Sequence, residues 1–237
     1  WFEDSLQMNP LLATYMGDAR YNDRLPNFIG PEHIAAERAM NQRYLEAIRA
    51  IDPAGLSPSD RISYDIFRIE RERQQRAERF PGELLPINQA GSLLTLMPAL
   101  GSGTNAQPFA TVQDYENWLK RLDGLAVWID QAIVNMRKGI ATGVVQPRAV
   151  TEKLLPQTEA MVAAKAADSP YFAPVKQFPA SFSAADRERL TAEYTKALDE
   201  RLLPAYRRLH AFLRDEYLPK SRATVAWTAL PDGQAWY

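Results

Sequence analysis

Few residues in this sequence could do chemistry, and none stands in the spacing of a known catalytic motif. The two histidines, His33 and His210, lie far apart on separate predicted helices, and no His-Glu-x-x-His is present. Catalytic zinc usually takes three protein ligands, commonly including histidines. We therefore predict no metal site in this sequence and interpret both histidines as partly exposed helix residues. Cysteine is absent, which excludes disulfides, thiolate chemistry and zinc sites built on sulfur.

Two further patterns fall short of a site. Residues 101–106 read Gly-Ser-Gly-Thr-Asn-Ala and match the dinucleotide-binding fingerprint letter for letter, but they lack the preceding strand and the following helix start. Ser102 does not stand in the Gly-x-Ser-x-Gly nucleophile elbow. Paired carboxylates such as Glu70 and Glu72 lie on charged helix faces. We interpret residues 101–106 as a flexible loop and the paired carboxylates as a solvated helix surface.

An aromatic stripe and a polar cluster each allow two interpretations. Tyr115, Trp118 and Trp128 could form a sugar or cofactor platform, but two of the rings fall on a predicted core face, which favours packing. The polar run at residues 20–24 follows a helix end. It is either a ligand-facing loop or a hydrogen-bonded turn, and the turn is favoured.

Composition restricts the class of protein. The chain has 237 residues, of which 46% are hydrophobic and 24% charged, so a globular chain with a real core is expected. The formal net charge of −1 argues against nucleic acid or anionic lipid as the main partner. No apolar run approaches the ~18 residues that a membrane span needs, so we predict no transmembrane segment.

The clearest element that could position any site is a long helix from Thr111 to Gly143. Thr111 and Asp114 have the spacing of a capping box, and Gly143 followed by Pro147 ends the element. Its apolar residues form a broad stripe at helical spacing: Tyr115, Trp118, Leu119, Leu122, Leu125, Ala126, Ile129, Ala132, Ile133, Met136 and Ile140. The width of the stripe predicts a bundle helix.

Start and stop signals predict the other helices. Residues 1–18 read as two short helices, with Asn9 capping the second and Gly17 ending it. Longer helices are expected to begin at Pro31, Pro58, Pro147 and Ala184, the second of them placing Ile62, Ile66 and Ile69 on one face. Pro156 should interrupt the helix that begins at Pro147, and Pro204 should kink the last one.

The stretch at residues 80–110 contains too many prolines and glycines for a long helix and too many leucines for a solvated loop. We expect a buried irregular segment whose backbone polar groups are satisfied individually. The predicted fold class is all-α: an irregular multi-helix bundle with long, partly kinked helices. It forms a single domain over residues 1–237, with a possible subdivision near 80–110. A few extended residues around Val225–Trp227 are the only strand signal.

Several blocks carry a resemblance to a known family. They include Gly-Asp-x-Arg-Tyr-x-Asp-Arg-Leu-Pro from Gly17, Gly-Ile-x-x-Gly-x-x-x-Pro-Arg from Gly139, and Leu-Pro-Asp-Gly from Leu230. With these blocks in this order, essentially the whole chain resembles the N-terminal part of the bacterial family catalogued as domain of unknown function 885.

The resemblance implies a longer, mostly helical protein that is similar to helical zinc metallopeptidases. In such proteins a His-Glu-x-x-His-type motif lies on a C-terminal helix, where zinc activates water and the glutamate acts as general base. This sequence stops at Tyr237, before any such motif, so zinc is expected in the missing C-terminal part and no catalytic residue is assigned. The aromatic residues at both ends suggest a chain cut from a longer polypeptide. Export or lipoprotein signals in many members imply a periplasmic or membrane-anchored location.

The N-terminal half of such an architecture usually forms one wall of a substrate channel. The candidate substrate-binding residues are Asp18, Arg20, Tyr21, Asn88, Gln89, Arg148 and Tyr237. Each also has a structural explanation. Asp18 and Arg20 could pair across a turn, and Asn88 could satisfy buried backbone groups. Arg148 could cap a helix, and Tyr237 could be a core residue.

Two functions are consistent with these patterns. The first is the helical scaffold and substrate-channel half of a zinc-dependent, peptidase-like hydrolase that acts on peptides, with the remainder of its own polypeptide as partner. The alternative is a self-contained, non-catalytic helical module that binds a peptide or a protein partner.

Overall fold

A computed structural model describes all residues 1–237 and shows an all-α protein, as predicted. The only β pairing is a single bridge between Pro147 and Arg222. The helices are α1 (Phe2–Met8), α2 (Pro10–Tyr15), α3 (Pro31–Arg49), α4 (Pro58–Ala77), α5 (Leu93–Leu100), α6 (Val112–Thr142), α7 (Arg148–Ala163), α8 (Ala173–Lys176), α9 (Ala184–Ala197), α10 (Leu203–Phe212) and α11 (Gly233–Trp236). No helix combines the length and the apolar content that a bilayer span requires.

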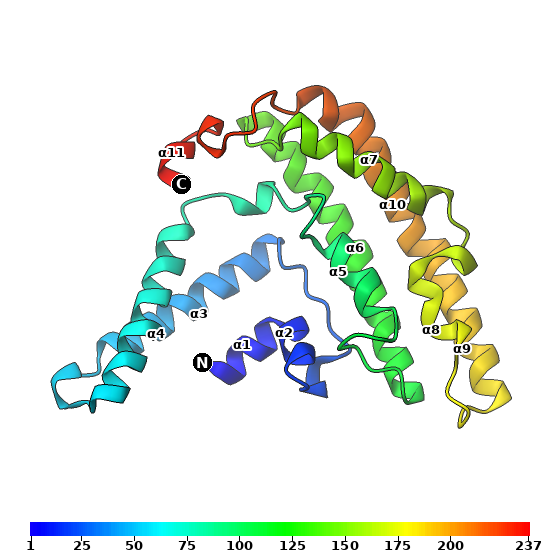
Figure 1. The fold of residues 1–237 in the computed structure, drawn as a ribbon, viewed down its shortest axis with the longest axis horizontal. Helices are drawn as coiled ribbons and strands as arrows, with labels where there is room; N and C mark the ends of the chain where they lie inside the picture. Colours follow the sequence, from blue (N-terminus) through cyan, green and yellow to red (C-terminus); the bar gives the residue numbers. More distant parts are fainter.

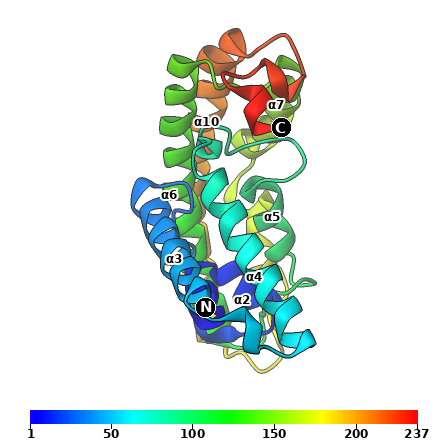
Figure 2. The ribbon, with the colours of Figure 1, turned by 90° about the vertical axis from the view of Figure 1, so that its left-hand side faces the viewer.

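The helices form an arch with two arms (Figure 1). One arm is the α3–α4 hairpin, and the other is built from α6, α7 and the α9–α10 helix. The helices α1 and α2 lie between the arms, while α11 and the C-terminus lie where the arms meet. Figure 2 shows that α3, α6 and α10 occupy one side of the arch and α4, α5 and α7 the other.

The long predicted helix is confirmed as α6, the centre of the core. Thr111 Oγ1 accepts a hydrogen bond from the Asp114 N–H (3.3 Å), and the Asp114 carboxylate accepts one from the Thr111 N–H (2.8 Å). Gly143 ends the helix at φ +78°, in the left-handed region that favours glycine. Tyr115, Trp118 and Trp128 are all buried, so the aromatic stripe is core packing.

The last long helix is continuous but contains two π-helical turns, Leu198–Leu202 and Leu213–Tyr217. A kink was predicted at Pro204, and the structure has the π-helical turn Leu198–Leu202 just before this residue. Pro204 has no N–H to donate and its ring clashes with the Glu200 carbonyl, so the preceding turn widens. Leu198, Leu202 and Tyr217 are buried, which keeps the widened helix packed in the core.

Exposed ion pairs join α6 to this helix along its length. The pairs are Glu116–Arg189 (2.9 Å), Asp123–Arg201 (2.8 Å), Asp130–Arg208 (2.8 Å) and Arg137–Glu216 (2.6 Å). On α6 these residues recur every seven positions, which is about two helical turns, and their partners follow in the same order because the two helices run parallel. The last interval on the partner is eight residues, since a π-helical turn inserts one extra residue.

Two local predictions are wrong. Pro156 does not interrupt α7, which runs unbroken from Arg148 to Ala163. Leu154 and Thr158 are buried and α7 packs along α10, so tertiary packing holds the helix together across the proline. Residues 225–227 form no strand, because no neighbouring strand exists to pair with them.

The α3–α4 arm is held together by polar contacts. Asn41 donates to the Arg71 carbonyl (3.1 Å) and accepts from the Arg71 guanidinium (3.2 Å). Leu45 is the buried apolar residue of α3, while α4 has no buried residue at all. The predicted apolar face of α4 exists, but Ile62, Ile66 and Ile69 are 62%, 59% and 39% exposed.

The N-terminal helices connect the arms. On the α3–α4 side, Tyr44 donates to Asp4 (2.7 Å) and Trp1 packs edge-on against Phe67. Asn9 caps α2 by accepting from the Leu12 N–H, and Gly17 follows its end at φ +81°, as predicted. On the other side, α2 is hydrogen bonded to α6 through buried side chains described below.

The segment between residues 80 and 110 is irregular and partly buried, with α5 as its one short helix. Ile87, Met97 and Leu100 are buried, and Gln146 donates to the Ile87 carbonyl (3.0 Å). The Gly-Ser-Gly stretch is a turn after α5 in which Gly103 has φ +78°. No strand precedes it, so the dinucleotide fingerprint is coincidental.

Candidate functional site

The predicted substrate-binding residues fall in separate parts of the arch, with no hydrogen bond or ion pair between the groups. Asp18, Arg20 and Tyr21 closely follow α2, the helix that lies between the arms (Figure 1). Asn88 and Gln89 precede α5, and Arg148 begins α7. Tyr237 ends the chain near the junction of the arms. They therefore do not form one site within this chain.

Asp18 and Arg20 pair with each other across the turn, one of the two arrangements expected from sequence. Arg20 donates to Asp18 (2.6 Å) and also to Glu3 (2.7 Å). The hydrogen bond from Arg20 lowers the pKa of Asp18, and the hydrogen bonds to both carboxylates raise the pKa of Arg20. The Tyr21 ring lies 5.4 Å from Arg20 and 5.1 Å from Arg24. Residues 18–24 thus present a surface of paired charges and one cation-flanked aromatic ring.

The other candidates show structural contacts as well. Asn88 Oδ1 accepts from the backbone of Ala90 and Gly91, so this side chain organises a turn. The Gln89 carbonyl accepts from Gln157 on α7 (3.1 Å), while the Gln89 Oε1 atom is buried without a partner.

Arg148 and Tyr237 are surface residues. The Arg148 side chain is about half exposed and lies 4.0 Å from Glu152, while its backbone N–H donates to the Arg222 carbonyl (2.8 Å). Tyr237 is 95% exposed, so the suggestion that it is a core residue is wrong. The final helix has only four residues and leaves this ring outside the packed cluster that precedes it.

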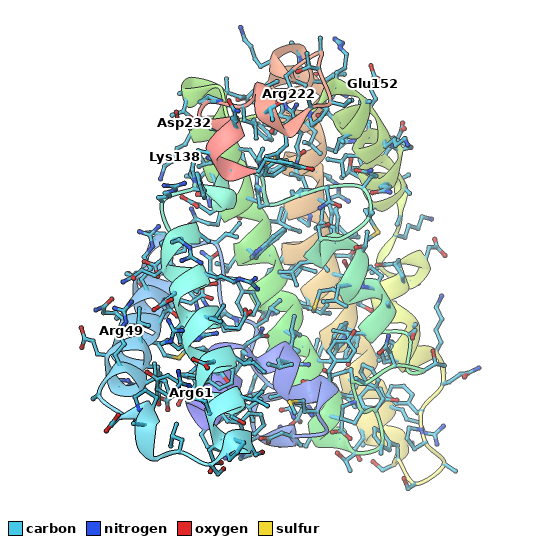
Figure 3. All side chains as sticks on the ribbon, turned by 60° about the vertical axis from the view of Figure 1, so that its left-hand side comes forward. Arg49, Arg61, Lys138, Glu152, Arg222 and Asp232 are labelled. Carbon is cyan, nitrogen blue, oxygen red and sulfur yellow. The ribbon has the colours of Figure 1, made fainter.

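A cavity of about 490 Å³ lies where the arms meet. It is lined by Arg79, Phe80, Pro81, Leu84, Thr142, Val144, Pro231, Asp232, Ala235 and Trp236. Figure 3 shows Arg222 and Asp232 at this end of the molecule, away from Arg49 and Arg61 on the α3–α4 arm. Phe80 and Trp236 pack with ring centroids 5.2 Å apart, and Arg79 donates to the Ala235 carbonyl (3.4 Å). The result is an aromatic cup with one cation and one carboxylate among its lining residues.

The Leu-Pro-Asp-Gly block holds this cup in place. Asp232 has φ +53°, and a Cβ atom on Gly233 would collide with the Trp227 carbonyl, so only glycine fits there. Pro231 rests against Gly143 at the end of α6.

The sequence analysis missed the most buried polar group, Arg121 on α6. Its guanidinium is 0% exposed and is held by backbone and side-chain acceptors from α2, from residues 21–24 and from Gln107. Arg121 follows Trp118 by three positions and precedes Leu125 by four, which places a charge inside the apolar stripe. This position within the apolar stripe was the sequence signal that could have identified Arg121 as a buried charge. Its hydrogen bonds join α6 to α2 and to residues 21–24.

The described side chains include no group of three or more histidine, cysteine, aspartate or glutamate residues that could hold a metal ion. His210 shares a hydrogen bond with Thr158 (2.9 Å), and His33 packs edge-on against Phe28. Both are half-buried helix residues, as predicted, and partial burial lowers the pKa of His33.

The fold is similar to that of solved structures. One of them is described as "the putative lipoprotein from Colwellia psychrerythraea" and shares 15% sequence identity, with a TM-score of 0.78. The match covers 98% of this chain but only 42% of that one, so this chain spans less than half the length of its structural relative. No curated protein matches the sequence.

A family model gives the assignment. The model described as "Bacterial protein of unknown function (DUF885)" matches residues 10–237. The match spans nearly the entire chain and includes all three blocks that carried the resemblance. The chain therefore belongs to the DUF885 family of bacterial proteins.

Proposed function

We propose that these 237 residues form the helical scaffold and one wall of a substrate channel in a zinc-dependent, peptidase-like hydrolase. The observation that carries the proposal is the coverage of the solved relative. The structural match covers 98% of this chain but only 42% of the relative, which is a single longer polypeptide. An open arch is the shape expected of one part of a larger enclosure. The zinc ligands and the general base would lie in the other part.

The residues between the arms are the proposed substrate contacts. Asp18, Arg20 and Tyr21 lie in this concave region. A peptide backbone could hydrogen bond to the Asp18–Arg20 pair, whose members are partly solvated and keep unused donor and acceptor positions. The aromatic cup at the junction of the arms suits an apolar side chain. We keep Asn88, Gln89, Arg148 and Tyr237 as secondary candidates.

Zinc, when bound by the longer protein, would supply a polarised water. The residues of this chain do not fit a zinc site, because no three potential ligands converge. Their role in the reaction is therefore to position substrate and to exclude water from the channel, and no chemical step is assigned to them.

The intact reading frame and the full-length protein test this proposal. The frame should encode a His-Glu-x-x-His-type motif outside these residues, and the protein should contain zinc and cleave peptides from a mixture until a chelator is added. A frame without such a motif, together with a metal-free protein that binds peptides but never cleaves them, would contradict it. That second outcome would favour a non-catalytic helical binding module.

We also propose that the longer protein is exported, as a periplasmic protein or a lipoprotein attached to a membrane. The lipoprotein description of the solved relative and the family membership support this location. Cell fractionation combined with metabolic fatty-acid labelling tests it. A protein recovered wholly with cytoplasmic markers and without label would rule it out.

A further inference from the structure

The helix α4 lacks the packing that a helix of its length normally has. It has twenty residues, and none of them is buried. Most helical stability in proteins comes from burying an apolar face, because an isolated helix of this length is marginal in water. Yet Ile62, Ile66 and Ile69 form an exposed apolar row, which we call the α4 stripe, with Ile62 and Ile66 each about 60% accessible. Continuous exposed apolar rows mark interaction surfaces.

Neither neighbour of α4 covers this stripe. Among the α4 residues, Arg71, Glu72 and Gln75 are hydrogen bonded to α3, and Phe67 packs against Trp1, which precedes α1. At about 100° per residue, Ile62, Ile66 and Ile69 lie on the opposite face of the helix. Figure 2 places α3 on one flank of α4 and leaves the other flank on the side of the arch that carries α5 and α7.

The charges that continue the stripe define the chemistry of what covers it. Arg73 and Arg76 follow Ile69 by four and seven positions, so they extend the same face. Arg73 contacts Glu70 (3.0 Å), while Arg76 forms no ion pair. A complementary surface would therefore be apolar opposite the isoleucines and acidic opposite the two arginines.

The solved relative indicates where such a surface would come from. It contains this fold within one polypeptide, and more than half of its residues lie outside the match. The neighbouring helix α5 is also incompletely covered, because Leu93, Leu94 and Leu96 are only partly buried at the edge of the core. Figure 2 shows the helices α4 and α5 on the same side of the arch.

We propose that the α4 stripe is the docking surface for a helix of the same polypeptide outside residues 1–237. That helix presents apolar side chains to Ile62, Ile66 and Ile69 and acidic side chains to Arg73 and Arg76. The inference rests on the proposed function only in that the chain is part of a longer protein. It requires no zinc and no peptidase activity.

Cysteine labelling of the full-length protein tests the proposal, since these 237 residues contain no cysteine of their own. Ile66→Cys is compared with Val127→Cys, because the two native side chains are 59% and 58% exposed here. The helices that carry them, α4 and α6, lie on opposite sides of the arch (Figure 2). Maleimide modification is measured by mass spectrometry of each peptide. Modification of Ile66→Cys should be slower by about ten-fold or more in native protein and equal to the control in urea.

Equal labelling rates in native protein would overturn the proposal. Protection of Ile66→Cys that disappears on dilution would also overturn it, because the surface would then contact a second copy. Hydrogen exchange of residues 58–77 in the unaltered full-length protein provides a measurement without a variant, and fast exchange along the whole helix counts against docking. Protection without zinc or peptide cleavage would support this docking while contradicting the proposed function.

Discussion

The guanidinium of Arg121 donates a 2.6 Å hydrogen bond to Thr14 Oγ1, joining the middle of α6 to the end of α2. The same side chain donates to the carbonyls of Pro10, Tyr21 and Arg24. No carboxylate contacts it, and burial lowers the pKa of Arg121 to about 10. A charge is thus held by neutral acceptors, four of which lie between 97 and 111 positions earlier in the sequence.

Replacing Arg121 with methionine should destabilise the protein by about 3 kcal/mol. Methionine fills similar volume but leaves several buried acceptors without donors, and each buried unsatisfied group costs about 1–3 kcal/mol before relaxation. Urea unfolding followed by circular dichroism measures the change. Residues 10–24 should also become more sensitive to proteolysis, because their hydrogen bonds to α6 are lost.

Arg208→Met is the matched control, since it removes an arginine that pairs with Asp130 on the surface. Both side chains of that pair are about half exposed, so the loss should stay below about 1 kcal/mol and shrink further in salt. A similar loss of unfolding free energy in the two variants would mean that the buried hydrogen bonds of Arg121 stabilise the protein no more than an exposed ion pair does.

A second prediction concerns Gly124, one turn beyond Arg121. A Cβ atom at this position would lie 2.5 Å from the Leu25 carbonyl oxygen. The backbone of the loop before α3 therefore packs directly against the backbone of α6. Gly124→Ala should cost about 1–2 kcal/mol, because the steric penalty exceeds the ~1 kcal/mol that alanine gains as a helix former. Gly82→Ala is the control, since nothing lies within 4 Å of its Cβ position. Stabilisation by Gly124→Ala would show that the loop moves away freely.

The capping box of α6 gives a third prediction. Thr111→Ala removes the oxygen that accepts from the Asp114 N–H, and helix caps of this kind contribute about 1 kcal/mol. Gln113→Ala, at the exposed position between them, should change the free energy of unfolding by less than about 0.5 kcal/mol. Equal stabilities of the two variants, measured by urea unfolding, would contradict the assignment of Thr111 as the cap.

Helix boundaries could be predicted where the signals are local. Thr111, Asp114 and Gly143 act on residues at most four positions away, so the start and the end of α6 can be predicted from the local sequence. Pro156 shows the limit of this reasoning. Its local preference is to end a helix, but α7 packs along α10 from more than forty residues away, and that packing prevails.

The contacts of the candidate residues were harder to predict, because many of their partners are distant in the sequence. The pairing of Asp18 with Arg20 could be anticipated from their spacing, whereas the link from Arg20 to Glu3 could not. Arg121 was visible as a charge within an apolar stripe, but its acceptors lie on α2 and residues 21–24. The aromatic cup requires Phe80 and Trp236 to meet across most of the chain.

The buried tyrosines predict how the protein responds to alkali. Burial raises the pKa of Tyr217 to about 12 and raises the pKa values of Tyr171, Tyr194 and Tyr206 well above the ordinary 10. The unfolded chain releases these phenolic protons near pH 10 while the folded chain keeps them. Stability from this source is therefore complete below pH 10 and is lost as the pH rises from 10 towards 12, by about 1.4 kcal/mol per pH unit for each tyrosine.

Phenolate absorbance at 295 nm from these residues should consequently rise together with the loss of helical circular dichroism, in one cooperative step above about pH 10. Tyr194→Phe should make the free energy of unfolding depend less steeply on pH, because one linked proton is removed. The substitution also removes the hydrogen bond from the Tyr194 hydroxyl to the Tyr115 carbonyl (3.0 Å). Tyr237→Phe is the control, since that ring is almost fully exposed and its substitution should leave the transition in place. Full ionisation of all tyrosines in a protein that keeps its helical signal would contradict the prediction, because the buried hydroxyls would then have to reach solvent without unfolding.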